Sequence, residues 1–148
     1  MEVYLETGKT ITQHNKETQA IPPKYTPVWF GLEDVNRQDL YNRIDRRVEQ
    51  MLQCGLLNEI QALLDMGIDE KSTAMQAIGY KEFVAVLKGD CPSADAVASV
   101  QQASRHYTKR QLTWFRRNSS MHWLSRQFGE TTEEILIRAR QILAENDE

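Results

Sequence analysis

Residues 93–117 read SADAVASVQQASRHYTKRQLTWFRR, the longest stretch of the chain with helical character. Ser93 follows a break at 89–92, and its hydroxyl predicts a helix N-cap. Apolar side chains recur after it at spacings of three and four, the pattern of a helix with one buried face. The members of that face are Val97, Val100, Ala103 and Tyr107. The stretch therefore predicts one long helix that continues to about Arg117.

A second helix is predicted directly after Asn36, whose side chain can cap it. Apolar residues repeat at helical spacing along this segment as well. They are Leu40, Ile44, Val48, Met51 and Leu52. Gly55 interrupts the pattern, and a further helix is expected from there to about Gly67.

Two more helices complete the prediction. Residues 72–79 (STAMQAIG) read as a polar-edged turn that leads into a helix over 80–87. The last helix begins at the capping box Thr131-x-x-Glu134, in which each side chain can satisfy the other residue's backbone N–H. Its expected buried residues are Ile135, Ile142 and Leu143. Residues 36–148 are therefore predicted to be an α-helical region, and the fold class is a mainly α helical bundle.

The first 35 residues have a different character. Residues 1–9 read as the end of a helix with Gly8 as its C-cap, and residues 10–20 as a polar, mobile loop. Prolines at 22, 23 and 27 favour extended backbone. Residues 28–32 (VWFGL) predict a strand, for which no second strand is evident. Region 1–35 is therefore predicted to be an extended arm whose strand has an exposed edge.

Composition excludes several classes of protein. The 148 residues are 41% hydrophobic and 26% charged, as in soluble globular domains. The chain has no apolar run of membrane-spanning length and no signal-peptide pattern, so a soluble cytoplasmic protein is expected. The two cysteines and three histidines have no metal-ligand spacing, so we expect no metal in this chain.

The net charge of −3 hides a basic segment, because no Asp or Glu occurs between Ala96 and Gly129. Its cations are Arg105, Lys109, Arg110, Arg116, Arg117 and Arg126. Cations neutralise phosphates, and Trp114 and Phe115 between them could stack on an unpaired base. The alternative is a solvated basic face with both aromatic rings in the core.

Two other groups of residues are candidates for binding. In 72–81, Gly79 permits close backbone approach beside Gln76, Tyr80 and Lys81, although an ordinary helix–helix turn has the same composition. The helix after Asn36 carries Arg43, Arg46 and Arg47, with Asp39 and Glu49 available as ion-pair partners.

No catalytic motif accompanies these groups. The sequence contains no G-x-x-x-x-G-K-[ST] phosphate loop, no G-x-G-x-x-G and no G-x-S-x-G. Its carboxylates form no evident general acid–base pair. From the residues alone, the chain is expected to bind a partner without a catalytic centre of its own.

Four motifs in register resemble one family. They are EVYL-x-TGK at 2–9, RIDRRVEQML-x-x-GLLNE at 43–59, STAMQAIGYKE at 72–82, and KRQLTWFRR at 109–117 followed by HWL at 122–124. Together they resemble the C-terminal portion of the tRNA dimethylallyltransferase (tRNA isopentenyltransferase, IPP transferase) family, over essentially the whole chain. The resemblance implies the C-terminal part of an α/β enzyme similar to P-loop kinases, without the P-loop core.

The implied activity is transfer of a dimethylallyl group from dimethylallyl diphosphate to N6 of the adenine 3′ to the anticodon, assisted by Mg²⁺. The family's phosphate loop and catalytic aspartate have no counterpart here, so this chain is expected to hold no catalytic residue and no cofactor, and to be inactive alone. Its partner would be the tRNA anticodon arm, and dimethylallyl diphosphate would bind only with the missing N-terminal core. Because the strand at 28–32 completes a sheet in the family, we expect a homodimer, an arm swap or a piece of a longer enzyme.

Contact with tRNA carries over onto two motifs, which in the family line the channel for a flipped base. The residues are Gln76, Ala77, Ile78, Gly79, Tyr80 and Lys81, and Lys109, Arg110, Gln111, Leu112, Thr113, Trp114, Phe115 and Arg116. Lys109 and Arg116 are expected to contact phosphates, and the resemblance places Arg43 and Arg47 on the diphosphate side. Two other hypotheses are a stand-alone helical RNA-binding module and a helical domain that binds an acidic protein.

Overall fold

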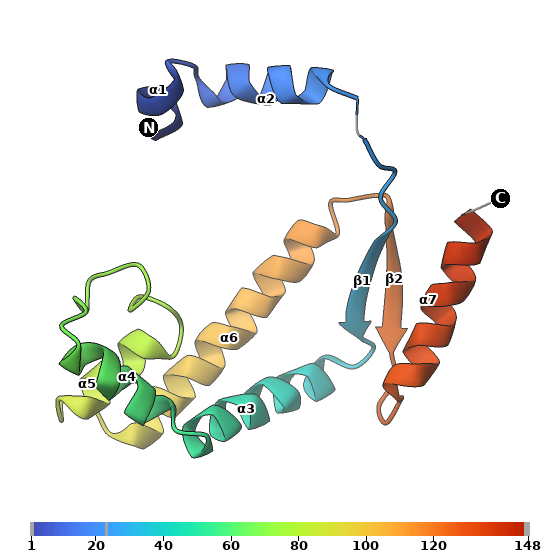
Figure 1. The fold of residues 1–148 in the computed structure, drawn as a ribbon. Helices are drawn as coiled ribbons and strands as arrows, with labels where there is room; N and C mark the ends of the chain where they lie inside the picture. The colour runs from blue at the N-terminus through green and yellow to red at the C-terminus, as the bar shows by residue number, and fades with distance from the viewer. Residues whose placement is uncertain (1, 23, 147–148) are drawn as a thin grey trace.

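The computed structural model describes residues 2–22 and 24–146. The elements in chain order are α1 (Glu2–Thr7), α2 (Ile11–Ala20), β1 (Trp29–Asp34), α3 (Arg37–Gln53), α4 (Leu56–Asp65), α5 (Tyr80–Leu87), α6 (Ser93–Phe115), β2 (Met121–Arg126) and α7 (Thr132–Asn146). Figure 1 shows α3 and α6 running between an end formed by α4 and α5 and an end formed by the two strands. The predicted mainly helical fold is confirmed.

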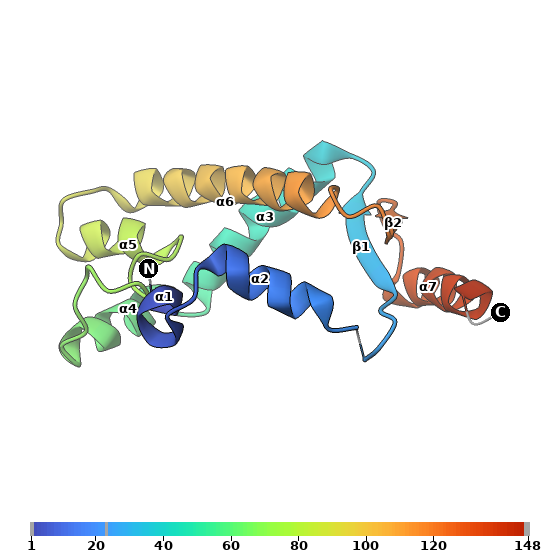
Figure 2. The ribbon, with the colours of Figure 1, turned by 90° about the horizontal axis from the view of Figure 1, so that it is seen from above.

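The hydrophobic core lies where α3, α4, α5 and the first half of α6 meet. Its buried members are Val48, Leu56, Ile60, Met75, Phe83, Val84, Ala96 and Val100. Phe83, Ile60 and Met75 are fully enclosed, and Met75 fixes the connection between α4 and α5 to this core. Gly79 turns the chain into α5 with φ of 101°, and its N–H donates to the Glu82 carboxylate at 2.8 Å. Figure 2 shows α4 and α5 gathered beside the start of α6.

The two strands form a parallel pair with Trp29 opposite Met121 and Asp34 opposite Arg126. The predicted strand is confirmed over 29–34, but the expectation that it has no partner in the chain was wrong, because β2 pairs with it. The segment MHWLSR has no continuous apolar run, so its own pattern gives a weak strand signal. Because β2 lies within region 36–148, that region is not wholly helical as predicted. The described residues give β1 no partner on its other edge.

Side chains fix the register of this pair. Ser125 donates its hydroxyl to Glu33 at 3.3 Å, and the Arg126 guanidinium contacts Asp34 at 2.7 Å. Each contact joins residues that are direct cross-strand partners, so a slipped register would break both. Gly31 lies opposite Trp123, and a Cβ there would come within 2.7 Å of the indole ring.

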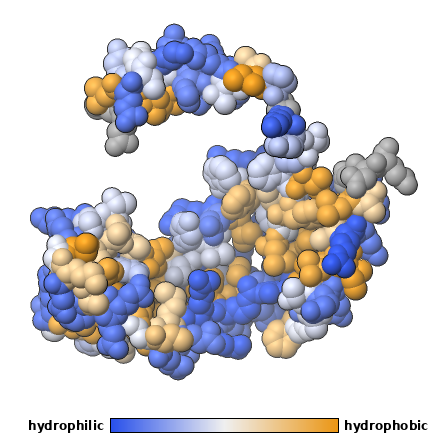
Figure 3. All heavy atoms as spheres, viewed as in Figure 1, coloured by the Kyte–Doolittle hydropathy of each residue, from blue (hydrophilic) through white to orange (hydrophobic). Residues whose placement is uncertain are grey.

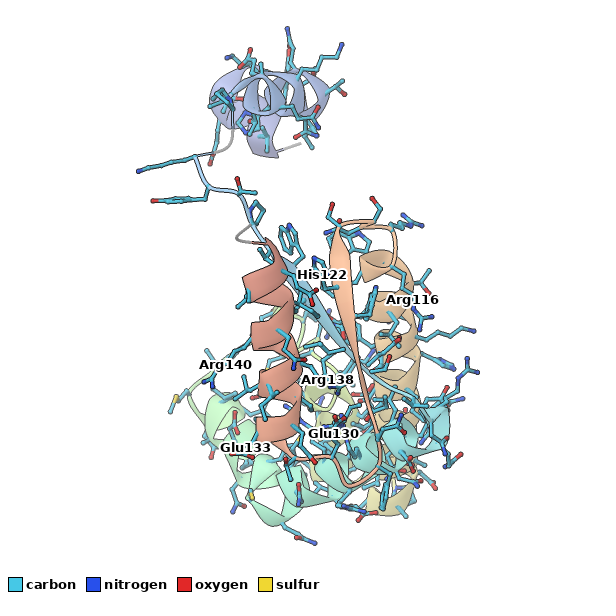
Figure 4. The ribbon with its side chains drawn as sticks, turned by 90° about the vertical axis from the view of Figure 1, so that its right-hand side faces the viewer. Arg116, His122, Glu130, Glu133, Arg138 and Arg140 are labelled. Atoms are coloured by element: carbon cyan, nitrogen blue, oxygen red, sulfur yellow. The ribbon has the colours of Figure 1, made fainter. Side chains whose placement is uncertain are left out.

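α6 and α7 lie on opposite sides of the strand pair (Figure 1). Arg138 of α7 donates to the Ser125 carbonyl at 3.1 Å and contacts Glu130 at 2.6 Å, as Figure 4 illustrates. Figure 3 shows apolar residues gathered over the strands and α7. The exposed large side chains of these elements include Trp29, Leu32, Leu136, Ile137 and Leu143.

Most of the predicted helix starts are confirmed. Asn36 accepts from the Gln38 N–H at 2.8 Å, and Glu134 accepts from the Thr131 N–H at 2.8 Å while Thr131 accepts from the Glu134 N–H at 3.3 Å. The prediction for Ser93 was wrong by one position, because Pro92 is the N-cap and provides no side-chain acceptor.

Three details of burial and length differ from the prediction. α6 ends at Phe115 rather than at Arg117. Tyr107 is 48% exposed because α6 has passed beyond the core at that point. Leu143 is 41% exposed, and Ile135 and Ile142 are half-buried, since α7 packs mainly against the narrow β2.

The N-terminal region contains more helix than predicted. α1 ends at Thr7 and Gly8 follows it as expected, with the Gly8 N–H bonded to the Tyr4 carbonyl at 2.8 Å. Residues 11–20, predicted to be loop, form α2 and have only exposed side chains. Local contacts explain the difference, because Thr10 caps the Gln13 N–H at 3.2 Å and Lys9 pairs with Glu17 at 2.6 Å. A helix with no buried face leaves no apolar periodicity in the sequence.

Candidate nucleic-acid interface

A groove of about 610 Å³ lies between α3, the α4–α5 connection and α6. α3 contributes Ile44, Arg47, Val48 and Met51, the connection contributes Gln76, Ala77 and Ile78, and α6 contributes Val100, Ser104, Tyr107, Thr108 and Gln111. The groove therefore joins members of both motifs that the sequence singled out, although Gln76 and Gln111 lie 35 positions apart. Its surface combines apolar side chains with amide and hydroxyl groups, which suits a flat, partly polar ligand.

The two glutamines of the groove are held differently. Gln76 follows the buried Met75, and its side-chain amide donates to the Glu70 carbonyl at 2.9 Å. Gln111 lies on the exposed part of α6 and makes no side-chain hydrogen bond with any described residue. Its carboxamide can therefore offer a donor and an acceptor to a ligand.

Tyr80 and Lys81 were predicted beside Gln76, but neither lines the groove. Tyr80 donates its hydroxyl to Glu59 of α4, and this hydrogen bond raises the pKa of the phenol. Lys81 forms an ion pair with Glu82 at 3.7 Å. Tyr80 thus contacts an acid of the neighbouring helix α4, and Lys81 contacts the next residue of its own helix α5.

The structure separates Arg43 from Arg47. Arg47 lines the groove with Gln76, whereas Arg43 pairs with Asp34 at 3.2 Å. Arg43 lies in a second cavity of about 220 Å³ where β1 and β2 end. Arg46 and Arg126 also line that cavity. The available partners Asp39 and Glu49 are not used by Arg43, because the end of β1 brings Asp34 closer.

Acids distant in the sequence neutralise half of the basic segment. Arg105 pairs with Asp45 at 2.6 Å, Arg116 with Glu33 at 2.6 Å, and Arg126 with Asp34 at 2.7 Å. The Arg116 guanidinium also lies 5.8 Å from the centre of the Trp123 ring. Figure 4 shows Arg116 beside the strands, on the side away from α7. Arg116 thus joins α6 to the sheet, which weakens the expectation that it contacts phosphate.

The remaining three cations, Lys109, Arg110 and Arg117, form no ion pair with a described residue. They border a shallow hollow of about 520 Å³ together with Trp114. Trp114 is 65% exposed, so the interpretation that placed it in the core is wrong. Phe115 is 38% exposed and lines a cleft against β1 and β2.

Comparison with known proteins identifies the family. The family model described as IPP transferase matches residues 1–118. The chain belongs to the IPP transferase family. This match includes α3 to α6 and therefore every side chain that lines the groove.

Relatives in the IPP transferase family carry the name tRNA dimethylallyltransferase. The protein of Acetivibrio thermocellus is 36% identical over 144 residues, which cover 97% of this chain and 46% of that protein. The protein of Staphylococcus epidermidis is 44% identical over 127 residues, covering 86% of this chain and 37% of its own length. The chain spans less than half the length of these curated relatives.

Two solved IPP transferase structures have the same fold over this region. The tRNA delta(2)-isopentenylpyrophosphate transferase of Staphylococcus epidermidis superimposes with a TM-score of 0.74 at 38% identity, over 99% of this chain and 46% of that chain. The full-length tRNA isopentenylpyrophosphate transferase of Bacillus halodurans gives a TM-score of 0.74 at 35% identity, over 88% and 42%. The helices and the two strands therefore belong to an IPP transferase fold.

Sequence reasoning missed the hydroxyl groups of the groove. Ser104, Thr108 and Gln111 continue the stripe of Ala96 and Val100 along α6 at spacings of three and four. The stripe changes from buried apolar residues to exposed or half-buried polar ones as α6 leaves the core. This change from apolar to polar residues along one helical face can be read from the sequence. Polar residues on a face that packs towards other elements indicate a binding site rather than a core.

Proposed function

We propose that this chain provides the tRNA-contacting helices of a tRNA dimethylallyltransferase, and that the groove between α3 and α6 receives an unpaired adenine. The observation that supports the proposal is the groove itself, in which Gln76–Ile78 lie across from Gln111. The family membership supports RNA as the ligand, since the relatives are named for tRNA. The implied product is an adenine 3′ to the anticodon that carries a dimethylallyl group on N6.

The groove has the chemical features that a nucleobase needs. Ile44, Met51 and Ile78 provide apolar surface for the faces of a base. Gln111 and the Ser104 and Thr108 hydroxyls can bond the polar edge, and a carboxamide matches the adjacent donor and acceptor of adenine. An unpaired base offers both surfaces once it leaves its stack. The groove therefore suits a flipped base, and Arg47 in its lining adds a cation for a neighbouring phosphate.

The transfer step itself is not assigned to residues of this chain. Its 148 residues include no phosphate-binding loop motif. Among the described residues, no three side chains of His, Cys, Asp or Glu are grouped so that they could hold a metal ion. The residues present therefore do not fit the Mg²⁺ that the family reaction implies, and no catalytic step is derived from them. We expect no transfer of a dimethylallyl group by this chain alone.

No helix in the described part of the chain is both long enough and apolar enough to cross a membrane.

A titration of the chain with a labelled anticodon stem-loop tests the proposal. The RNA carries adenine after the anticodon, and the comparison RNA is abasic at that nucleotide. Gln111→Ala should weaken binding of the adenine RNA about threefold to tenfold, the value of one hydrogen bond. It should leave binding of the abasic RNA unchanged.

Gln102→Ala is the matched control, because Gln102 is an exposed glutamine of the same helix that does not line the groove. It should bind both RNAs as the unmodified chain does. Equal losses for Gln111→Ala on the adenine and abasic RNAs would contradict the base-binding role of the groove.

A further inference from the structure

α3 crosses α6 beside the groove (Figure 2), and polar side chains join the two helices there. The Asp45 carboxylate of α3 contacts the Arg105 guanidinium of α6 at 2.6 Å. The Gln101 side-chain amide donates to the Asp45 carbonyl at 3.5 Å, and the Arg105 guanidinium lies 5.8 Å from the centre of the Tyr41 ring. Tyr41 and Asp45 are one turn apart on α3. Gln101 and Arg105 are one turn apart on α6, so one side of each helix faces the other.

The ion pair of Asp45 with Arg105 adjoins both walls of the groove without lining it. Asp45 directly follows Ile44, which belongs to the α3 wall. Arg105 directly follows Ser104, which belongs to the α6 wall. The side chains of Arg105 and Asp45 are 27% and 32% exposed, so both are largely enclosed. The pair therefore connects the two walls of the groove and neutralises its own charge.

The apolar core supports only one end of the groove. The last buried residue of α6 is Val100, and Gln111 lies eleven positions further along the helix. A tilt of α6 by about 10° about Val100 would move Gln111 by about 3 Å, the full length of an N–H···O hydrogen bond. The ion pair at Arg105 opposes this tilt, because it fixes α6 to α3 about midway between the two positions. The pair of Arg116 with Glu33 joins the end of α6 to the sheet instead of to α3.

We propose that Asp45 and Arg105 are positioning residues of the base-binding groove. Their ion pair sets the separation of α3 and α6, and this separation places Gln111 across from Gln76. The inference rests on the proposed function for the identity of the ligand. It also changes the interpretation of Arg105, which the sequence groups with cations available to phosphate. Arg105 acts through the shape of the groove instead of through contact with RNA.

The test uses the full 148-residue chain and labelled anticodon stem-loops that carry either adenine or an abasic site after the anticodon. Asp45→Ala should lower the ratio of adenine affinity to abasic affinity about threefold to tenfold, as Gln111→Ala does. The two substitutions combined should lower this ratio no further than either alone, because both remove the same hydrogen bond. A residue that only stabilises the fold would change both affinities alike, so an unchanged ratio in Asp45→Ala overturns the positioning role.

Arg105→Gln distinguishes positioning from phosphate contact. It should lower the same affinity ratio and leave the slope of log affinity against log salt unchanged. A lost phosphate contact would instead reduce that slope by about 0.7 to 0.9. The charge reversal Asp45→Arg/Arg105→Asp should restore part of the ratio.

Glu49→Ala is the matched control, because Glu49 is an exposed carboxylate of α3 that does not line the groove. It removes the same charge from the same helix and should leave the affinity ratio unchanged. Circular dichroism establishes that each variant keeps its helix content, so that a lower ratio is not loss of folding.

Spin labels on α3 and α6 provide a measurement that needs no RNA. The labels are attached at Gln50 and His106, two exposed positions outside the groove. Cys54→Ser and Cys91→Ala first remove the native thiols. The distribution of distances between the labels should broaden in Asp45→Ala, because the two helices lose the contact that fixes their separation.

The outcomes separate this inference from the proposed function. An unchanged distance distribution in Asp45→Ala, with Gln111→Ala still lowering the affinity ratio, overturns the positioning role and leaves the groove. A broadened distribution, with no effect of Gln111→Ala on the ratio, supports the positioning role and contradicts the groove as the site of the base. A reduced salt slope in Arg105→Gln identifies a phosphate contact and overturns the positioning role.

Discussion

Asp34 holds together the end of the sheet, and its replacement by alanine is expected to destabilise the protein. Asp34 is the last residue of β1, and its side chain is 9% exposed. It accepts two hydrogen bonds from Arg126, at 3.0 Å from Nε and 2.7 Å from Nη2, and a third from Arg43 at 3.2 Å. Asp34→Ala removes all three and leaves two arginines facing each other at the end of the strand pair.

The expected cost follows from the exposure of the partners. Breaking a fully buried ion pair costs about 3–5 kcal/mol, and a charge-assisted hydrogen bond contributes about 1.5–3 kcal/mol. The Arg126 side chain is 24% exposed and that of Arg43 is 46% exposed, so water can replace part of what is lost. We therefore expect the free energy of unfolding to fall by about 2–3 kcal/mol. For a chain of this size that lowers Tm by about 4–12 °C.

Thermal unfolding followed by tryptophan emission measures this effect, because Trp29 and Trp123 belong to the two strands. Asp90→Ala is the control, since Asp90 is an exposed carboxylate between α5 and α6 and its loss changes the net charge equally. Asp34→Asn, which keeps one acceptor oxygen, should fall between the two. If Asp34→Ala and Asp90→Ala lower Tm by the same amount, the Asp34 contacts do not stabilise the sheet and the reasoning is refuted.

Two further predictions concern Gly31 and Glu134. Gly31→Ala should cost about 1–3 kcal/mol of unfolding free energy, because its Cβ would lie 2.7 Å from the Trp123 ring and from Met121 Sδ; denaturant unfolding with an unchanged midpoint would contradict this. The Thr131 N–H and hydroxyl lower the pKa of Glu134, so its contribution to stability is present at neutral pH and is lost as the pH falls through that lowered pKa. The protection factors of the first α7 amides, which are corrected for the intrinsic exchange rate at each pH, should fall in acid. Glu134→Gln should remove this pH dependence while Glu133→Gln, in the same helical turn, retains it; equal behaviour of both variants would exclude the capping contact.

Local signals accounted for the helices and could not account for the sheet. Asn36 and Thr131 cap the helices they precede because the capping contact lies within three residues. The pairing of β1 with β2 depends on residues about 90 positions apart, such as Asp34 and Arg126. The segment 121–126 owes its extended form to that pairing and carries little strand signal of its own. Helix α2 escaped prediction for the opposite reason, since it has local caps and no buried face.

The candidate site divides in the same way. The family resemblance pointed to 76–81 and 109–116 as continuous runs, whereas a helix presents successive residues to different surroundings. Gln111 lines the groove, Arg110 borders the 520 Å³ hollow beside Trp114, and Leu112 lines the cleft beside β1. The period of 3.6 residues per turn is enough to predict that these three neighbours face different surroundings. The ion pair of Arg116 with Glu33 could not have been foreseen, because it joins residues 83 positions apart.

The distribution of acids explains how one helix can combine a structural role with binding. A stretch without acids reads as a uniform basic surface, yet Asp45 of α3 and Glu33 of β1 reach α6 and neutralise Arg105 and Arg116. Those two pairs attach α6 to α3 and to the sheet, which fixes its orientation. Lys109, Arg110 and Arg117 stay without an ion pair among the described residues, although Lys109 lines a cavity with Glu33 and Asp34. The charge that α6 leaves unpaired is therefore set by where the fold places the acids of α3 and β1.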